Sequence, residues 1–325
     1  MSHVKIISQE ANALRFLAYN SSCQIITYSE TLSDALATEI INTVQYINSM
    51  LDIYEKSSQL SHINSAPVNV PIKITEDLYC LLDILNQVTI YSNRAFDVTM
   101  GLLSKKWNFA LSAEIPESNK ELIPIVSDIG PFSYTLFKDN GSCFIEKYHE
   151  AVQFDAGAAG KGYACGYINN LLQKNGIHSA SIDLGGNLSL LGISPEEDSL
   201  WHVGIQRPWE LKGISICKLL LHGGLSVSTS GIYDKYIFHN GKMFHHLLDS
   251  STGMPIENNI ISCTVVCSNA LMADVLSTVL FAGGKSILEN LIHKMNLKYF
   301  IGYVILYKNG EIEISDCLKD HFFII

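Results

Sequence analysis

Residues 245–278 read HHLLDSSTGMPIENNIISCTVVCSNALMADVLST and carry more information about fold and chemistry than any other stretch of the chain. A turn containing glycine and proline precedes an apolar run at 260–267, which is typical of a buried strand. A second apolar segment follows this run. If residues 273–283 are helical, Asp274 and Thr278 lie one turn apart on the same face. A carboxylate and a hydroxyl that converge there would suit Mg²⁺. The simpler alternative is an aspartate that caps the helix and a threonine that packs beside it.

The bulk composition describes an ordered globular protein. Of the 325 residues, 47% are hydrophobic and 17% are charged, and the chain is long enough for one large core or two smaller lobes. The net charge is −10 and lysine and arginine form no cluster, so we expect no nucleic-acid partner. The apolar runs are short for crossing a bilayer, so we expect no membrane span.

The cysteines and the N-terminal residues indicate the compartment. None of the eight cysteines forms a C-x-x-C pair, and unpatterned thiols are typical of a reducing environment. The first residues lack the charged and apolar regions of a secretory signal. We therefore expect a cytoplasmic protein.

The order of predicted elements indicates an α+β fold. Apolar residues recur every three or four positions at 30–51 and 75–91, with Thr75 as N-cap, and helices are also predicted at 162–174, 270–282 and 285–295. Strands are predicted at 180–191, 202–206, 214–221 and 260–267, with hairpins at 14–28 and 299–314 and loops with short strands at 104–148. Because no regular βαβ alternation occurs, we expect the α+β class. The sequence has no Pro/Ser-rich linker and no tandem repeat, so we expect one domain, 1–325, with possible lobes 1–150 and 151–325.

Two glycine-containing motifs are candidate ligand sites. Residues 155–162 read DAGAAGKG, in which small residues allow close approach of a ligand and Lys161 adds a positive charge at a helix start. A tight helix entry explains the same motif equally well. Gly185-Gly186-Asn187 interrupts a strand and is either a bulge or a ligand-lining segment.

Two further motifs have a structural and a functional interpretation. The hydroxyl-rich residues 228–231 are interpreted as a turn after a strand, whose side chains cap their own backbone. Ala95-Phe96-Asp97 follows a predicted helix and places an aromatic ring beside a carboxylate. The ring could hold a ligand ring system, although such a phenylalanine more often belongs to the core.

The order and spacing of these motifs resemble one family, the ApbE-type FAD:protein FMN transferases. The resemblance extends from about residue 14 to the C-terminus. The motifs that carry it are SQLSHIN at 58–64, AFD at 95–97, DAGAAGKG at 155–162, GGN at 185–187, TSG at 229–231, HLLDSSTGMP at 246–255 and ADVLST at 273–278.

The resemblance implies both a fold and an activity. The fold would be α+β, with mixed and antiparallel sheets, flanking helices and two closely packed lobes that hold FAD in a cleft. The chain would use Mg²⁺ to transfer the FMN moiety of FAD to a Ser or Thr hydroxyl of an acceptor flavoprotein. The product would be a phosphoester, and AMP would leave.

The resemblance also implies roles for individual residues. Asp274 and Thr278 would bind Mg²⁺ together with the carbonyl of Ala158, which gives Asp274 a catalytic role. His246 would be the general base for the acceptor hydroxyl, or else would orient the turn at Asp249. The residues that would contact FAD are Tyr54, Ala95, Phe96, Asp97, Asp155, Lys161 and Leu248.

Some positions depart from the family pattern. Asn20-Ser21-Ser22 stands where Met-Gly-Thr is expected, Arg94 stands where glycine is expected, and Ser250 stands where proline is expected. Two alternative functions stay open: an FAD pyrophosphatase that yields FMN and AMP, and a non-catalytic flavin-binding protein. A cytoplasmic setting would make a soluble reductase a suitable acceptor.

Overall fold

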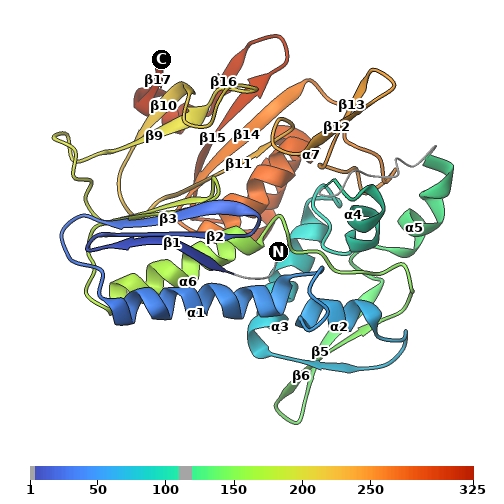
Figure 1. The fold of residues 1–325 in the computed structure, drawn as a ribbon. Coiled ribbons are helices and arrows are strands. Elements are labelled where there is room, and N and C mark those ends of the chain that lie inside the picture. The colour runs from blue at the N-terminus through green and yellow to red at the C-terminus, as the bar shows by residue number, and fades with distance from the viewer. Residues whose placement is uncertain (1–3, 110–118) are drawn as a thin grey trace.

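A nine-stranded antiparallel sheet organises the computed structural model, which describes residues 4–109 and 119–325. The strand pairing of this sheet brings together segments from the beginning, middle and end of the chain (Figure 1). Its order is β1 (Lys5–Glu10), β2 (Ala13–Ala18), β3 (Ser21–Thr27), β7 (Ala180–Leu184), β8 (Leu188–Leu191), β11 (Ser226–Gly231), β14 (Ile260–Cys267), β15 (Phe300–Tyr307) and β16 (Ile312–Ile314).

Three long helices cover this sheet. Figure 1 shows α1 (Asp34–Leu51) and α6 (Gly160–Lys174) lying beneath the N-terminal strands. Helix α7 (Ala270–Met295) packs against β11, β14 and α6. The contact between α6 and α7 places the two segments that carry the predicted phosphate and metal motifs next to each other.

The other helices and strands complete the molecule. One group comprises α2 (Gln59–Ser65), α3 (Glu76–Tyr91), α4 (Gly101–Trp107), α5 (Ile123–Asp128), β4 (Ile72–Ile74), β5 (Tyr134–Asp139) and β6 (Ser142–Lys147). A second sheet comprises β9 (Trp201–Gln206), β10 (Ser215–Leu221) and β17 (Phe322–Ile324), and β12 (Tyr236–His239) pairs with β13 (Lys242–His245). Short 3₁₀ helices occur at Asn119–Glu121 and Asp316–His321.

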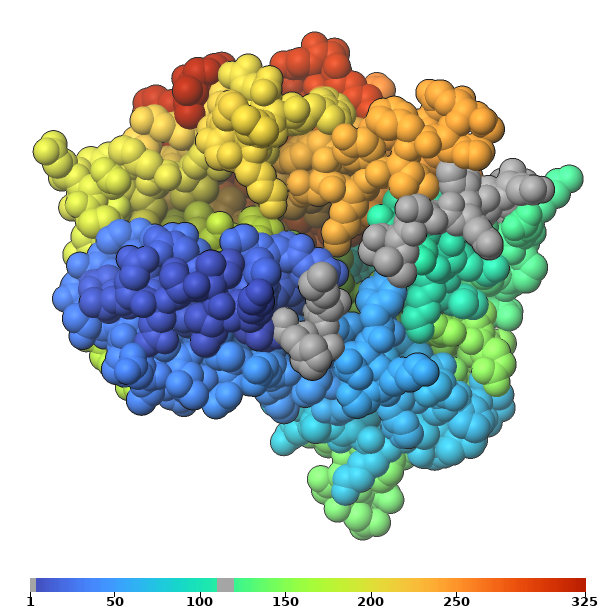
Figure 2. Space-filling view, viewed as in Figure 1, coloured from blue at the N-terminus to red at the C-terminus, as the bar shows by residue number. Residues whose placement is uncertain are grey.

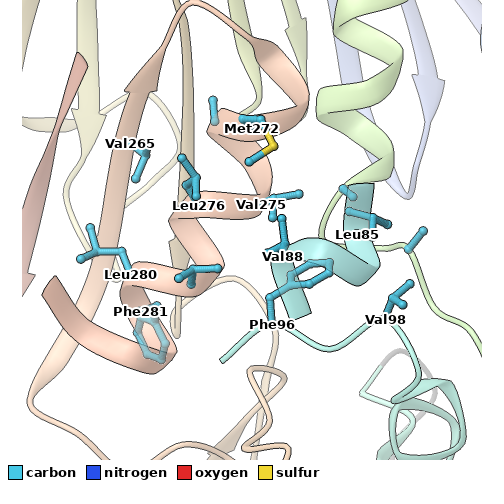
Figure 3. Close-up of a cluster of buried hydrophobic side chains, with 14 of the residues drawn as sticks. Leu85, Val88, Phe96, Val98, Val265, Met272, Val275, Leu276, Leu280 and Phe281 are labelled. Carbon is cyan, nitrogen blue, oxygen red and sulfur yellow. The ribbon is translucent and has the colours of Figure 1, made fainter. Parts of the chain in front are cut away.

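Helix α7 is the core helix of the molecule. Figure 3 shows it between Val265 of β14 on one side and Val88 and Phe96 on the other. Among the described helices, α7 alone has the length and hydropathy to cross a membrane, which the sequence did not lead us to expect. Its packing against strands and helices on several sides is that of a core helix in a globular protein.

Most of the predicted elements are confirmed. Helices α1 and α3 occur where the apolar spacing predicts them, and the side chain of Thr75 accepts the N–H of Leu78 as an N-cap. The backbone breaks from helical geometry at Gly284 (φ 72°, ψ −176°), between the two helices predicted for this region. The α+β class with mainly antiparallel sheets is confirmed, whereas the division into lobes stays a prediction.

Three predictions need correction. Residues 228–231 are not a turn but belong to β11, an interior strand paired with β8 and β14. Helix α6 begins at Gly160 rather than at 162. The region 104–148, predicted as loops with short strands, also contains α5, and its residues 110–118 lie outside the described residues.

Candidate active site

A buried carboxylate on α7 is the centre of the candidate site. Asp274 is only 5% exposed, and its Oδ2 accepts a hydrogen bond of 2.9 Å from the backbone N–H of Gly162 in α6. Its Oδ1 accepts a bond of 3.2 Å from the hydroxyl of Ser228 in β11. Burial raises the pKa of Asp274, and the nearby Lys161 and these hydrogen bonds oppose that rise. Three elements therefore converge on one carboxylate.

Glycine at position 162 is required for this approach. A Cβ there would lie 2.4 Å from the carbonyl oxygen of Ala270 and 2.7 Å from Cβ of Asp274. Only a residue without a side chain lets the first turn of α6 come so close to α7. The N–H groups of Gly160, Gly162 and Tyr163 in this turn are already bonded within the protein. The positive charge of Lys161 is therefore the group of this motif that suits an anion.

The amide of Asn187 links the carboxylate to the lysine. Its hydrogen-bonding partners orient the side chain so that its nitrogen donates to Oδ1 of Asp274 (3.2 Å) and to Oγ of Ser228 (2.5 Å). Its oxygen accepts from Nζ of Lys161 at 3.2 Å. The lysine also donates to the carbonyl of Gly185 at 3.4 Å. The Gly185-Gly186-Asn187 motif therefore contributes a polar wall to the site.

The second predicted metal ligand lies on the same face of α7. Ser230, two residues beyond Ser228 on the same face of β11, has its hydroxyl 3.1 Å from Oγ1 of Thr278 and 2.7 Å from Oγ of Ser277. Asp274 and Thr278 thus face successive inward-pointing serines of one strand. This arrangement fits the predicted convergence of the carboxylate and the hydroxyl.

The donor set suits a hard cation that also binds a ligand phosphate. Across residues 4–109 and 119–325, no three His, Cys, Asp or Glu side chains are grouped to hold a metal ion. No hydrogen bond within the described chain reaches the carbonyl of Ala158, because the N–H of Gly162 is directed to Asp274. One carboxylate, one hydroxyl and one carbonyl fit Mg²⁺, which commonly takes few protein ligands and completes its shell with phosphate and water.

His246 is held with one ring nitrogen engaged and the other free. Its Nδ1 lies 3.2 Å from the carbonyl of Lys235, which can only accept, so Nδ1 carries the proton. Nε2 is then the basic nitrogen. Burial, aided by the charge of Lys235, lowers the pKa of His246 to about 3, so the imidazole is neutral at physiological pH. Its neighbour His245 is buried and bonds the carbonyl of Ile256, as expected of a structural residue.

The charges of Lys161 and Asp155 act on the pKa values of several other site residues, which indicates that these residues lie near one another. The charge of Lys161 acts on the pKa values of His246, Asp274 and Lys235. Burial lowers the pKa of Lys235 and Asp155 opposes this, while burial and then Asp155 raise the pKa of Tyr54. Figure 2 shows the surface hollowed where the blue N-terminal segment meets the yellow and orange segments.

The Ala95-Phe96-Asp97 motif is placed differently from the rest. The ring of Phe96 is 4% exposed and packs in the core beside Val88, so its side chain follows the structural alternative (Figure 3). The carboxylate of Asp97 is fully buried and bonds Arg94 and Thr99. Ala95 lies against Gly283 of α7, where an added Cβ would come within 2.9 Å. Contacts of this motif with FAD stay a prediction.

The remaining FAD-contact prediction concerns Leu248. Its backbone forms an antiparallel bridge with Pro255, and its side chain is half-buried. The residue therefore lies on the first arm of a short hairpin that starts immediately after His246. Whether it touches FAD stays a prediction.

The sequence did not single out Lys235, Ser228 and Ser230 as site residues, whereas it offered Asn187 as part of a possible ligand-lining segment. The turn interpretation of residues 228–231 concealed the two serines, because a strand without apolar alternation has no period-2 signal. The hairpin that leads to His246 could have been found from Asn240-Gly241, a strong turn pair, and it would have placed Lys235 opposite the histidine.

The fold and the site together define an α+β protein in which a buried carboxylate lies beside a lysine at the junction of two helices and an interior strand. The chain belongs to the ApbE family, because the model of that family matches residues 19–301. This confirms the family and the enzyme class expected from the sequence, that of FAD:protein FMN transferases.

Individual relatives support the assignment. An FAD:protein FMN transferase of Klebsiella pneumoniae is 27% identical over 251 residues, which are 77% of this chain and 76% of the relative. The crystal structure of the ApbE protein of Thermotoga maritima superposes on this chain with a TM-score of 0.81 and 25% sequence identity. The superposition covers 96% of this chain and 99% of the Thermotoga chain. The flavin transferase ApbE of Vibrio cholerae shares the fold, with a TM-score of 0.78, 21% identity and coverage of 98% and 100%.

Proposed function

We propose that this protein transfers the FMN moiety of FAD to a Ser or Thr hydroxyl of an acceptor protein and releases AMP. The observation that carries the proposal is the junction of α6 and α7, where the N–H of Gly162 and the amide of Asn187 hold Asp274 beside Lys161. A positive charge and a carboxylate in one place suit a pyrophosphate with a bound divalent cation.

The residues of this chain supply positioning and charge for phosphoryl transfer. The acceptor oxygen forms a bond to the FMN phosphorus, and the bond from that phosphorus to the AMP oxygen breaks. His246 is oriented to take the hydroxyl proton on Nε2, because its Nδ1–H faces the carbonyl of Lys235. Lys161 offsets the charge that builds up on the pyrophosphate oxygens.

Mg²⁺ is the cation we propose for this site. Asp274, Thr278 and the carbonyl of Ala158 would hold it, and bound Mg²⁺ would neutralise charge on the pyrophosphate and the departing AMP. The close fit of Gly162 against α7 supports this, since it fixes the carboxylate at the anion-binding turn of α6.

We also propose a cytoplasmic setting and a cytoplasmic acceptor, such as a soluble reductase. All eight cysteines are free thiols and six of them are buried, which fits a protein that folds in a reducing compartment. The acceptor hydroxyl must reach Nε2 of His246, so it has to be presented on an extended or loop segment.

The test is intact-mass spectrometry of the protein incubated with FAD, Mg²⁺ and an acceptor that carries a short flavinylation sequence, with AMP assayed in parallel. A gain of one FMN on the acceptor, matched by AMP, supports the transferase. AMP and free FMN without modification of several acceptors would indicate the pyrophosphatase instead. FAD binding without any AMP would leave a flavin-binding protein.

A further inference from the structure

We infer that Arg94 is a positioning residue for the catalytic histidine. It joins the segment 95–99 to the turn 249–253, two parts of the chain that lie more than 150 residues apart, and so fixes the hairpin that starts after His246. The inference rests on the proposed function, since it concerns the geometry of the same site.

The guanidinium of Arg94 makes two of the contacts that join these segments. Its Nε donates to Oδ2 of Asp97 at 2.8 Å, and its Nη2 donates to the carbonyl of Ser250 at 3.3 Å. The side chain of Asp97 is 0% exposed, so this ion pair is shielded from water on the carboxylate side. The other oxygen of Asp97 accepts from the N–H and the hydroxyl of Thr99.

The contact is reciprocal. The hydroxyl of Ser250 donates a bond of 2.6 Å to the carbonyl of Arg94, so each residue binds the backbone of the other. Arg94 has a φ of 64°, in the left-handed region that long side chains rarely adopt. Its N–H is held by the carbonyl of Thr89 at 2.9 Å. A rare backbone conformation fixed on both sides indicates that this contact restrains both segments.

The turn held by Arg94 determines the direction of the hairpin arm that directly follows the histidine. Asp249 pairs with Met254 through N–H and carbonyl at 2.8 Å, and Leu248 bridges Pro255. These pairings close a short hairpin whose first arm begins immediately after His246. A shift of the turn therefore moves the imidazole, and displacement of a catalytic group by about 1 Å can lower a rate a hundredfold.

Positions 94 and 250 are the two at which this chain was expected to have glycine and proline. The structure shows that the two departures contact each other, which gives them a joint explanation. An arginine and a serine here form a hydrogen-bonded link between the two segments, where the expected glycine and proline have no side chains that could form it.

The guanidinium is reachable from solvent on one side. A surface pocket of about 510 Å³ is lined by Arg94 and, among others, Asn93, Gly130, Phe132 and His149. The Arg94 side chain is 27% exposed. Free guanidinium ion could therefore enter the space left when this side chain is shortened.

The test compares wild type with Arg94→Ala in the FMN-transfer assay, with and without guanidinium ion at concentrations far below those that unfold the protein. We expect kcat to fall about tenfold to a hundredfold, KM for FAD to change little, and guanidinium to restore most of kcat. Arg15→Ala is the matched control, because Arg15 on β2 forms an exposed ion pair with Glu10. This variant should keep full activity.

Different outcomes separate this inference from the proposed function. A wild-type protein that releases no AMP from FAD would reject the proposed function. An active wild type with an unchanged kcat in Arg94→Ala, or a folded Arg94→Ala that guanidinium does not rescue, would reject the positioning role. If Arg94→Ala does not fold, Arg94→Lys and Ser250→Ala replace it, and unchanged kcat in both would equally reject the role.

Discussion

The backbone N–H of Gly162 donates a hydrogen bond of 2.9 Å to Oδ2 of Asp274, across the contact between α6 and α7. The bond joins the segment that we assign to pyrophosphate binding to the one that we assign to Mg²⁺. It forms only because position 162 has no side chain, since an added Cβ would collide with Ala270 and Asp274. If the proposed Mg²⁺ and pyrophosphate bind here, helix packing would set the position of one relative to the other.

Gly162→Ala should damage both stability and activity. The added methyl group must push α6 away from α7, and overpacking of this kind typically costs about 1–3 kcal/mol of unfolding free energy. The shift also breaks the bond to Asp274, so a higher Mg²⁺ concentration should be needed for half-maximal AMP release. Urea unfolding and a Mg²⁺ titration of activity measure the two effects.

Gly166→Ala is the matched control for this substitution. Gly166 lies one turn further along α6, and an added Cβ there meets no atom within 4 Å. Replacing glycine by alanine in a helix interior typically stabilises by about 0.5–1 kcal/mol. If Gly162→Ala were as stable and active as Gly166→Ala, the close contact between the helices would not matter for the site.

Asp274→Asn should abolish Mg²⁺-dependent turnover while leaving the fold intact. Asparagine keeps the shape and can still accept from Gly162, but it has no charge for the cation. We expect the rate of AMP release to fall about a hundredfold or more, as it does when an enzyme loses one group that stabilises charge in the transition state. Isothermal titration with Mg²⁺ in the presence of FAD provides a second readout.

Normal FMN transfer by Asp274→Asn would remove the basis of the metal assignment. Asp198→Asn serves as its control, because Asp198 is exposed and, among the residues that the structure describes, pairs with the nearby His202 and backbone N–H groups. That variant should keep wild-type activity and the wild-type response to Mg²⁺.

The sequence allowed prediction where local patterns and packing agree. The apolar spacing of α1 and α3 and the apolar run of β14 each have one dominant interpretation, and the structure follows it. The positions of Asp274 and Thr278 follow from helical periodicity alone once α7 is recognised.

Other features depend on tertiary contacts that leave no local pattern. β11 is rich in serine and threonine because Ser228 and Ser230 bond α7 and, on the other face, Thr229 bonds Thr264 of β14, where hydrocarbon side chains would only pack. The ring of Phe96 packs beside Val88 in the core, although the neighbouring carboxylate of Asp97 suggested a ligand contact (Figure 3). The reciprocal bonds of Arg94 and Ser250 join residues that no sequence spacing relates.

His246→Asn should slow FMN transfer without preventing FAD binding. Asparagine can donate to the carbonyl of Lys235, as Nδ1 does, but it offers no basic nitrogen to the acceptor hydroxyl. Loss of a general base typically costs about 10²–10⁴-fold in rate, and this loss should appear in kcat rather than in KM for FAD.

His62→Asn, at an exposed position on α2, is the control for this variant and should be as active as wild type. An equal kcat for His246→Asn and wild type would leave the histidine with only its alternative role of orienting the turn at Asp249.

The same histidine should make the protein sensitive to acid. Burial lowers the pKa of His246 to about 3, against a value near 6.5 in the unfolded chain. Between these values the unfolded chain binds a proton that the folded chain does not, so stability must decrease as pH falls from about 6.5 toward 3.

Relative to His246→Asn, the wild type should therefore lose on the order of 1 kcal/mol of unfolding free energy between pH 7 and pH 5. This is less than the roughly 1.9 kcal/mol that pKa values of 6.5 and 3 would give over these two pH units, because the half-buried imidazole keeps some contact with solvent. Urea unfolding of both proteins at the two pH values measures the difference. If the unfolding free energies of the two proteins changed equally with pH, the imidazole would protonate as readily in the folded chain as in the unfolded one. FAD would then bind beside a charged histidine at mildly acidic pH.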